Sequence, residues 1–110
     1  MVVEIWHNPR CSKSREALAA LQMRGIEPKT RLYLTDPPDV LEIEAMLAAL
    51  DLSAAALLRE REGAAIRHLA ESVIIAAMAA DPSLIERPVV RRGSRAVIAR
   101  PASRVDALFG

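Results

Sequence analysis

The chain begins with two different hydrophobic patterns. Residues 2–6 form a short apolar run interrupted by one acidic residue, which predicts a β-strand, and a polar, proline-bearing loop follows it. From Ser12 the apolar residues recur at steps of three and four, which predicts a helix that ends near Gly25. Residues 28–34 mix β-prone and apolar side chains and predict a second strand, since an acidic residue and two prolines come next.

The middle of the chain has helical patterns. Asp39 and Glu42 stand three residues apart and resemble a capping box, and the apolar residues that follow line one helical face. Further helices are predicted over 54–59, where a serine precedes the segment, and over 72–80, where Asp-Pro stops the pattern. We therefore expect a helical insertion between the second strand and the rest of the sheet.

The last part of the chain returns to strands. Residues 87–90 and 96–99, separated by a turn at 91–94, predict an antiparallel hairpin, and Pro101 opens a final helix. The order βαβ, helical insertion, ββ and α predicts an α/β fold with one mixed sheet and helices on both faces. The pattern contains no linker and no repeat, so residues 1–110 are expected to form a single domain.

Composition narrows the class of protein. Hydrophobic residues at 52% and charged residues at 26% are typical of a globular chain. The apolar run at the N-terminus is too short for a signal peptide, and no segment has the length of a membrane span. A single cysteine cannot form an internal disulfide. We therefore expect a cytoplasmic protein with a reduced thiol, no membrane contact and no nucleic-acid partner.

The net charge of +1 hides an uneven distribution of arginine. Six arginines lie in the stretch from Arg87 onward, where Asp106 is the single acid. Arginine suits planar, bidentate binding of oxyanions, so this end of the chain should attract anions. A codon preference for arginine is the alternative, and composition alone does not separate the two.

Cys11 stands where the first strand ends and the first helix begins. The reactive form of cysteine is the thiolate, and helix N-termini with nearby cations lower a cysteine pKa from about 8.5 to roughly 3.5 to 7.5. The unpaired amides of residues 12–14 and the charges of Arg10 and Arg15 supply both influences. A small buried cysteine is the alternative, but it would normally have apolar neighbours. The sequence therefore predicts a nucleophilic thiolate.

Three other kinds of cysteine site fit the sequence poorly. A zinc site with His7 and Cys11 would need more ligands, and the only other cysteine or histidine is the distant His68, so no metal is expected. A tyrosine-phosphatase cradle needs a longer spacing between cysteine and arginine than Cys11 and Arg15 have. Ser14 stands where a Cys-x-x-Cys motif would place its second sulfur, so another molecule must resolve any disulfide formed here.

Residues 7–15, His-Asn-Pro-Arg-Cys-Ser-Lys-Ser-Arg, resemble the active-site signature of the glutaredoxin-coupled, ArsC-like arsenate reductases. Later family motifs follow in the same order: Tyr33-Leu34 with Pro37-Pro38, Leu57-Leu58-Arg59, Glu86-Arg87-Pro88-Val89-Val90 and Arg100-Pro101. The resemblance covers nearly the whole chain. It implies a thioredoxin-like fold with an extra helical segment, in agreement with the element order above.

The resemblance also implies roles for individual residues. Cys11 matches the nucleophile that attacks the arsenic of arsenate. Pro88 matches the proline that follows a cis bond and faces the active site. The matched arginines that hold the oxyanion are Arg59, Arg87 and Arg100. The remaining matches are His7, which would tune the thiol, and Ser14 and Arg15, which would support the loop.

The same resemblance implies a borrowed-thiol reaction without a bound cofactor. Glutathione would be the co-substrate that attacks the arsenic adduct, and glutaredoxin would resolve the mixed disulfide as arsenite leaves. Each arginine also has a plainer interpretation: Arg59 could neutralise a helix end, Arg87 could pair with Glu86, and Arg100 could be solvated. The stretch between Arg59 and Arg87 is shorter than is usual in the family.

Two other functions stay open at this point. Cys11 could exchange with glutathione on other disulfides, with the arginines holding the carboxylates of glutathione. An Spx-like regulator that binds RNA polymerase is the non-enzymatic alternative, although Ser14 removes the Cys-x-x-Cys switch typical of that group. Such a regulator would need an exposed interaction surface, and the arginine-rich hairpin is the candidate.

Overall fold

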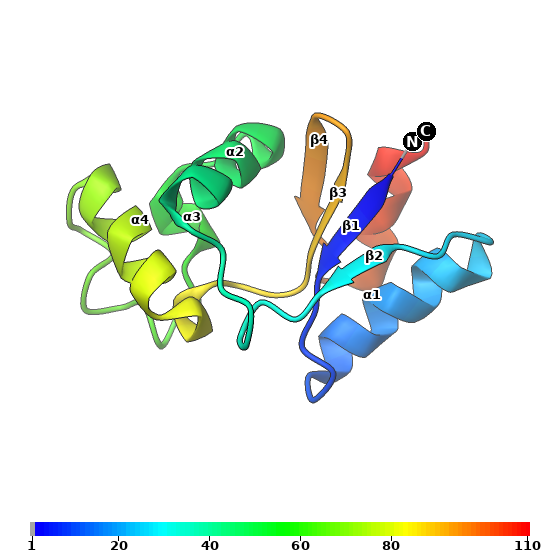
Figure 1. Cartoon of the computed structure of the whole chain (residues 1–110), viewed down its shortest axis with the longest axis horizontal. Coiled ribbons are helices and arrows are strands. Elements are labelled where there is room, and N and C mark those ends of the chain that lie inside the picture. The colour runs from blue at the N-terminus through cyan, green and yellow to red at the C-terminus, as the bar shows by residue number, and fades with distance from the viewer. Residues whose placement is uncertain (1) are drawn as a thin grey trace.

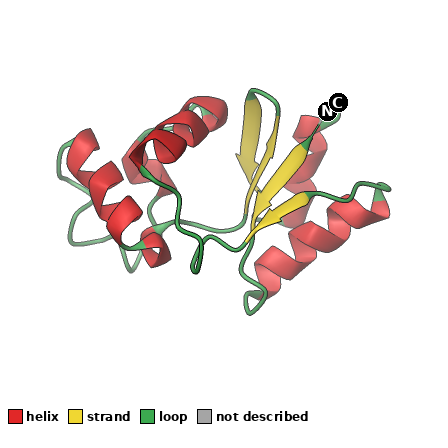
Figure 2. Ribbon diagram, in the orientation of Figure 1, coloured by secondary structure: helices red, strands yellow, loops and turns green. Residues whose placement is uncertain are grey.

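A computed structural model describes residues 2–110 as one four-stranded sheet with helices on both faces (Figure 1, Figure 2). The strands are β1 (Val3–Trp6), β2 (Lys29–Arg31), β3 (Val89–Arg92) and β4 (Arg95–Ile98). The helices are α1 (Ser12–Met23), α2 (Val40–Leu50), α3 (Ala54–Leu57) and α4 (Glu71–Ala80), with the 3₁₀ helices η1 (Pro82–Leu84) and η2 (Ala102–Leu108). None of these helices is long and apolar enough to cross a membrane.

The sheet has the strand order β2-β1-β3-β4. β1 is parallel to β2, as a strand–helix–strand unit requires, and the other two pairs are antiparallel. The helices α1 and η2 cover one face of the sheet, and α2, α3 and α4 lie on the other side (Figure 1). The predicted mixed sheet with helices on both faces is confirmed.

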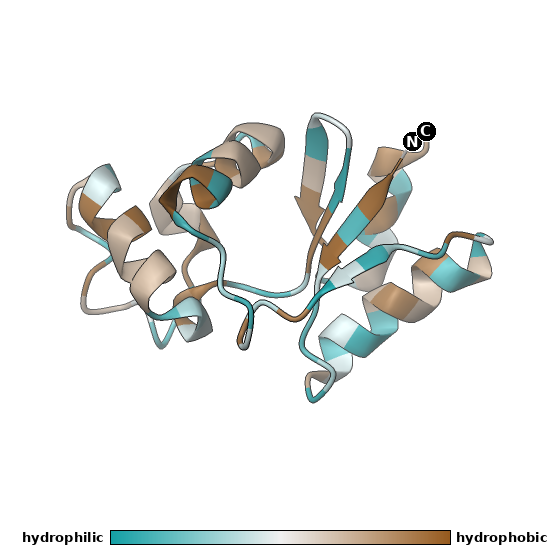
Figure 3. Ribbon diagram, viewed as in Figure 1, coloured by the Kyte–Doolittle hydropathy of each residue, from teal (hydrophilic) through white to brown (hydrophobic). Residues whose placement is uncertain are grey.

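Neighbouring residues of the central strands contribute to two separate hydrophobic clusters. On β1, Ile5 packs with α1 and η2, whereas Trp6 packs with the helical insertion. On β3, Val89 packs with the helical insertion, whereas Val90 packs with α1 and η2. Successive side chains of a strand point to opposite faces, so both faces of these strands are buried. Figure 3 shows the hydropathy of the residues along these strands.

The helix ends follow the local signals in the sequence. The Asp39 carboxylate accepts a hydrogen bond from the Glu42 amide at 2.8 Å, and Glu42 Oε1 accepts one from the Asp39 amide at 3.1 Å. This reciprocal pair is the predicted capping box at the start of α2. Gly25, just beyond α1, has a φ of +76°, which glycine adopts without strain.

Loss of the Asp39 cap should destabilise the fold. In Asp39→Ala the Glu42 amide loses its acceptor, so the free energy of unfolding should fall by about 1 kcal/mol. Urea denaturation followed by circular dichroism measures this difference. Glu44→Ala, which changes an exposed carboxylate on the same helix, is the control and should change the free energy by less than about 0.5 kcal/mol. Equal values for the two variants would contradict the assignment of the cap.

Two predicted element boundaries in this part of the chain are wrong. The second strand is shorter than the predicted 28–34, because the amides of Thr35 and Asp36 both donate to the Leu32 carbonyl and turn the chain. The helix predicted over 54–59 ends at Leu57, since Leu58 instead pairs with Ile85 in an isolated β-bridge. The Leu58–Ile85 pairing joins two segments that the sequence pattern treats separately.

The C-terminal elements also differ from the prediction in detail. The hairpin strands extend further toward their turn, which contracts to two residues with Gly93 at a φ of +62°. Arg92 belongs to β3 because it pairs with Val3 on β1 and with Arg95 on β4, and its guanidinium donates to the Leu108 carbonyl at 2.7 Å. The final helix is a 3₁₀ helix over Ala102–Leu108.

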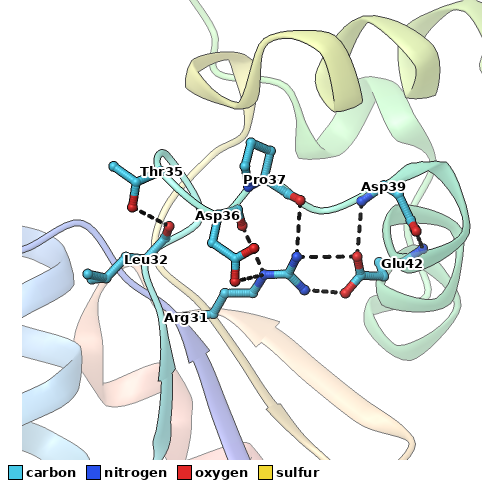
Figure 4. Close-up of polar contacts among 7 residues, drawn as sticks. All are labelled: Arg31, Leu32, Thr35, Asp36, Pro37, Asp39 and Glu42. Atoms are coloured by element: carbon cyan, nitrogen blue, oxygen red, sulfur yellow. Dashed lines mark hydrogen bonds and ion pairs between the residues drawn. The ribbon is translucent and has the colours of Figure 1, made fainter.

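Arg31 ties the sheet to the helical insertion (Figure 4). At the end of β2, its guanidinium donates to the carbonyls of Asp36 and Pro37, both at 3.0 Å. It also binds the carboxylate of Glu42, the same residue that completes the capping box. Hydrogen bonding from Arg31 lowers the pKa of Glu42. The segment between β2 and α2 is therefore anchored at both ends.

Candidate active site

The loop after β1 is folded by hydrogen bonds among its own residues. The Cys11 amide donates to the Asn8 carbonyl at 3.0 Å, and the Arg10 amide donates to Asn8 Oδ1 at 3.0 Å. Arg15, one turn into α1, donates from Nη1 to the Pro9 carbonyl at 2.9 Å. The Cys11 carbonyl accepts the first helical bond, so Cys11 is the N-cap of α1 and the following amides are free.

His7 and Ser14 form a buried contact beneath this loop. Their side chains meet at 2.6 Å between Nδ1 and Oγ, and Ser14 Oγ also accepts a hydrogen bond from the Asn8 amide at 3.0 Å. Burial, and then the charge of Arg15, lower the pKa of His7, so the neutral imidazole is favoured. Ser14, His7 and Arg15 thus hold the loop around Cys11, and a direct effect of His7 on the thiol stays a prediction.

The Cys11 thiol is partly exposed and has a lowered pKa. Burial alone would raise this pKa, but the hydrogen bond from Arg87, the backbone amides of Ser14 and Lys13, and the charge of Arg87 outweigh it. Two of the three amides that the sequence places near the sulfur therefore contribute. No group of three metal-binding side chains lies anywhere in residues 2–110 that could hold an ion.

Arg87 reaches Cys11 from the segment before β3. The Arg87–Pro88 peptide bond is cis, as the resemblance implies. The Arg100–Pro101 bond is also cis, which was not expected. The Arg87 amide donates to Glu86 Oε1 at 3.1 Å, and its carbonyl accepts from Arg100 Nη1 at 3.1 Å. The contacts of Arg100 thus brace the main chain of Arg87, and Arg100 also lies 3.8 Å from the Glu86 carboxylate.

Arg59 lies in the helical insertion, and hydrogen bonds within the insertion hold its main chain. Its amide donates to the Leu84 carbonyl at 2.8 Å, and its own carbonyl accepts from Arg67 Nη2 at 3.0 Å. Arg67 also donates to the Ala55 carbonyl at 2.9 Å. Sequence reasoning found no motif in this stretch and missed Arg67, because no local pattern signals which carbonyls a distant arginine will bind.

Glu62 forms an ion pair with the guanidinium of Arg59. Its Oε2 lies 3.0 Å from Arg59 Nε as an ion pair. Hydrogen bonding to its own amide lowers the pKa of Glu62, and the charges of Arg59 and Arg87 contribute further. Both arginines therefore act on the same carboxylate, which indicates that their charges converge. Arg59 Nη1 is buried and has no hydrogen-bond partner within residues 2–110.

Gly63 allows the turn that carries Arg59 to close tightly. A Cβ atom at this position would lie 2.7 Å from Leu58 Cβ and 2.8 Å from the Arg59 carbonyl oxygen. In Gly63→Ala the free energy of unfolding should therefore fall by about 1–3 kcal/mol, measured by urea denaturation. The exposed neighbour change Glu60→Ala should cost under about 0.5 kcal/mol. A Gly63→Ala protein as stable as the wild type would show that the turn is loose.

Tyr33 joins this group, although the sequence alone assigned it no role. Burial raises the pKa of its phenol, while Arg87 and Arg59 oppose the shift and the charge of Cys11 adds to it. Tyr33 is therefore near Cys11, Arg59 and Arg87, and Arg87 in turn acts on Cys11. This is an electropositive site around one thiolate, which can bind an anion and attack it.

A thiolate at a helix N-terminus, opposite a cis-proline at the start of a sheet strand, defines a thioredoxin-like protein. Comparison with known proteins is more specific, because the model of the ArsC family matches residues 6–108. The chain belongs to the ArsC family, as the motifs predicted.

Relatives align with the chain over almost its full length. YfgD of Escherichia coli K12, a protein of unknown function, is 41% identical over 98% of this chain and 97% of its own. An arsenate reductase of Neisseria meningitidis serogroup B is 36% identical, with 97% of each chain covered. The structure of an arsenate reductase from Vibrio cholerae superposes with a TM-score of 0.90 at 38% identity, also over 97% of each chain.

Proposed function

We propose that this protein reduces arsenate to arsenite, with glutathione as co-substrate and glutaredoxin as the partner that restores the thiol. The observation that carries the proposal is the Cys11 sulfur beside Arg87 at the N-terminus of α1, with a lowered pKa. Relatives named arsenate reductase support arsenate as the substrate. The cytoplasm, where glutathione keeps thiols reduced, is the compartment that this chemistry requires.

The proposed reaction balances with two thiols. The Cys11 thiolate attacks arsenic and displaces a protonated oxygen, which forms an arsenic–sulfur bond. A glutathione thiolate then attacks the Cys11 sulfur and forms a disulfide. The electron pair of the broken arsenic–sulfur bond stays on arsenic, which leaves as arsenite. Glutaredoxin takes the glutathione by thiol exchange and frees Cys11.

The arginines address the main obstacle to the first step. The thiolate and arsenate are both anions, so their approach is opposed by charge repulsion. Guanidinium groups from Arg59 and Arg87 reduce that repulsion and stabilise the charge that develops on the oxygens. Arg100 contributes by holding Arg87, and direct contact of Arg100 with the oxyanion is a further expectation. Arsenate would displace Glu62 from Arg59.

The test is arsenate-dependent oxidation of NADPH in the presence of glutathione, glutathione reductase and glutaredoxin. Turnover should require arsenate and glutathione and should stop when glutaredoxin is left out. Turnover supported by thioredoxin and its reductase instead would contradict the proposed donor. Absence of arsenate turnover, with rapid exchange between Cys11 and oxidised glutathione, would favour the alternative of a general thiol-exchange protein.

The Spx-like alternative finds little support in the hairpin that it would use. Arg91 donates to the Gly93 carbonyl, and Arg92 and Arg95 donate to carbonyls of the C-terminal segment. The Arg92 guanidinium also lies 4.9 Å from the centre of the Phe109 ring. These arginines are therefore bound to the chain itself. Recovery of RNA polymerase subunits with the purified protein would revive this alternative.

A further inference from the structure

Three side chains of the candidate site have buried polar atoms without a hydrogen-bond partner within the described residues. The atoms are the Tyr33 hydroxyl, Nε and Nη1 of Arg59, and Nε of Arg87. Native proteins leave few buried polar groups unpaired, because such groups have lost water without gaining a partner. Two of the three belong to the arginines of the proposed oxyanion site. The third is a phenol, an uncharged group whose hydroxyl can also donate to an oxyanion.

We infer that Tyr33 is a substrate-binding residue whose hydroxyl donates a hydrogen bond to the oxyanion that Arg59 and Arg87 hold. The inference rests on the proposed function and deepens it, since it adds a neutral donor to the two charged ones. None of the surface of Tyr33 is exposed. The Arg87 guanidinium acts on the Tyr33 oxygen as a donor, but neither Arg87 nor Arg59 can accept a hydrogen bond. The phenolic hydrogen therefore needs an acceptor that arrives with the substrate.

The local chain directs the Tyr33 side chain into the site. The flanking side chains of Leu32 and Leu34 are 45% and 40% exposed, whereas Tyr33 between them is fully buried. The turn that carries these residues is closed by two amides that donate to the Leu32 carbonyl. Arg31 anchors its far end through the Asp36 and Pro37 carbonyls (Figure 4). The hydroxyl is therefore held in place before substrate binds, which favours binding.

The electrostatic surroundings keep Tyr33 in the donor form. Burial raises the pKa of its phenol above the ordinary value, and the nearby Cys11 charge acts in the same direction. The guanidinium groups of Arg87 and Arg59 oppose this without reversing it. The phenol thus remains protonated when Cys11 is ionised. It offers one donor to an oxygen of the substrate and adds no further repulsion toward the thiolate.

Protection of Cys11 from alkylation measures oxyanion binding without turnover. Iodoacetamide reacts with Cys11, and inorganic phosphate or arsenate is added as the protecting anion in the absence of other thiols. Tyr33→Phe should need roughly tenfold more of either anion, or more than that, for half-protection, as the loss of a hydrogen bond to a charged group predicts. Thr35→Val removes an exposed hydroxyl that bonds the Leu32 carbonyl nearby, and it should leave the half-protecting concentration unchanged.

The outcomes separate this inference from the proposed function and from a packing role. Equal half-protecting concentrations for Tyr33→Phe and wild type would overturn the role of Tyr33 and leave arsenate reduction standing. The role of Tyr33 is likewise overturned if neither anion protects the wild type. A shift with phosphate in a protein that does not turn over arsenate would support Tyr33 and remove the proposed substrate. If Tyr33→Phe lowers the free energy of unfolding but leaves the half-protecting anion concentration unchanged, Tyr33 contributes to packing alone.

Discussion

Cys11→Ser is expected to lose arsenate-dependent NADPH oxidation by about a thousandfold or more, because an alkoxide forms far less readily than a thiolate. The fold should be retained, since Cys11 is partly exposed and serine is favoured at a helix N-cap. The coupled assay measures the loss, and urea denaturation checks the stability. Met23→Ala, which removes an exposed sulfur at the other end of α1, should keep full activity. Residual turnover in Cys11→Ser within tenfold of wild type would exclude Cys11 as the nucleophile.

Arg87→Ala has the second largest expected effect, and it acts on two measurements. Arg87 gives the largest contribution that lowers the pKa of Cys11, so the variant should have a higher thiol pKa. The rate of Cys11 alkylation should therefore stop rising at a lower pH in the wild type than in Arg87→Ala, because the rate follows the fraction of thiolate. Loss of the oxyanion donor should also reduce kcat/KM by about a hundredfold to a thousandfold.

Two further variants show what Arg87 contributes. Arg87→Lys keeps the charge but lacks the planar fork, so it should give an intermediate thiol pKa and recover only part of kcat/KM. Arg91→Ala changes a nearby arginine that bonds the Gly93 carbonyl and should leave both measurements unchanged. An alkylation profile in Arg87→Ala that overlays the wild type would mean that Arg87 does not activate the thiol.

The parts of the fold that sequence could predict are those with local causes. The capping box of Asp39 and Glu42 and the left-handed Gly25 involve residues a few positions apart, so their geometry follows from the sequence directly. The end of the helix predicted over 54–59 depended on a partner elsewhere in the chain. Leu58 leaves its helix to pair with Ile85, and no pattern around Leu58 indicates that partner.

In the candidate site, too, only the features with a local cause could be predicted from the sequence. The position of Cys11 at a helix N-terminus could be predicted from the change of hydrophobic period that follows it. The hydrogen bond from Arg67 to the Arg59 carbonyl could not be predicted, because it depends on the path of the turns between the two residues. Tyr33 was predicted in a strand, and only the folded chain brings its hydroxyl among the charges of the site.

The most direct test of the proposed chemistry is the intact mass of the protein after incubation with arsenate and reduced glutathione, without glutaredoxin. We expect one glutathione to become attached per chain, at Cys11, and we expect this to require arsenate. Addition of glutaredoxin should then restore the original mass. A protein that stays unmodified, or that gains glutathione equally well without arsenate, would contradict attack of the Cys11 thiolate on arsenate.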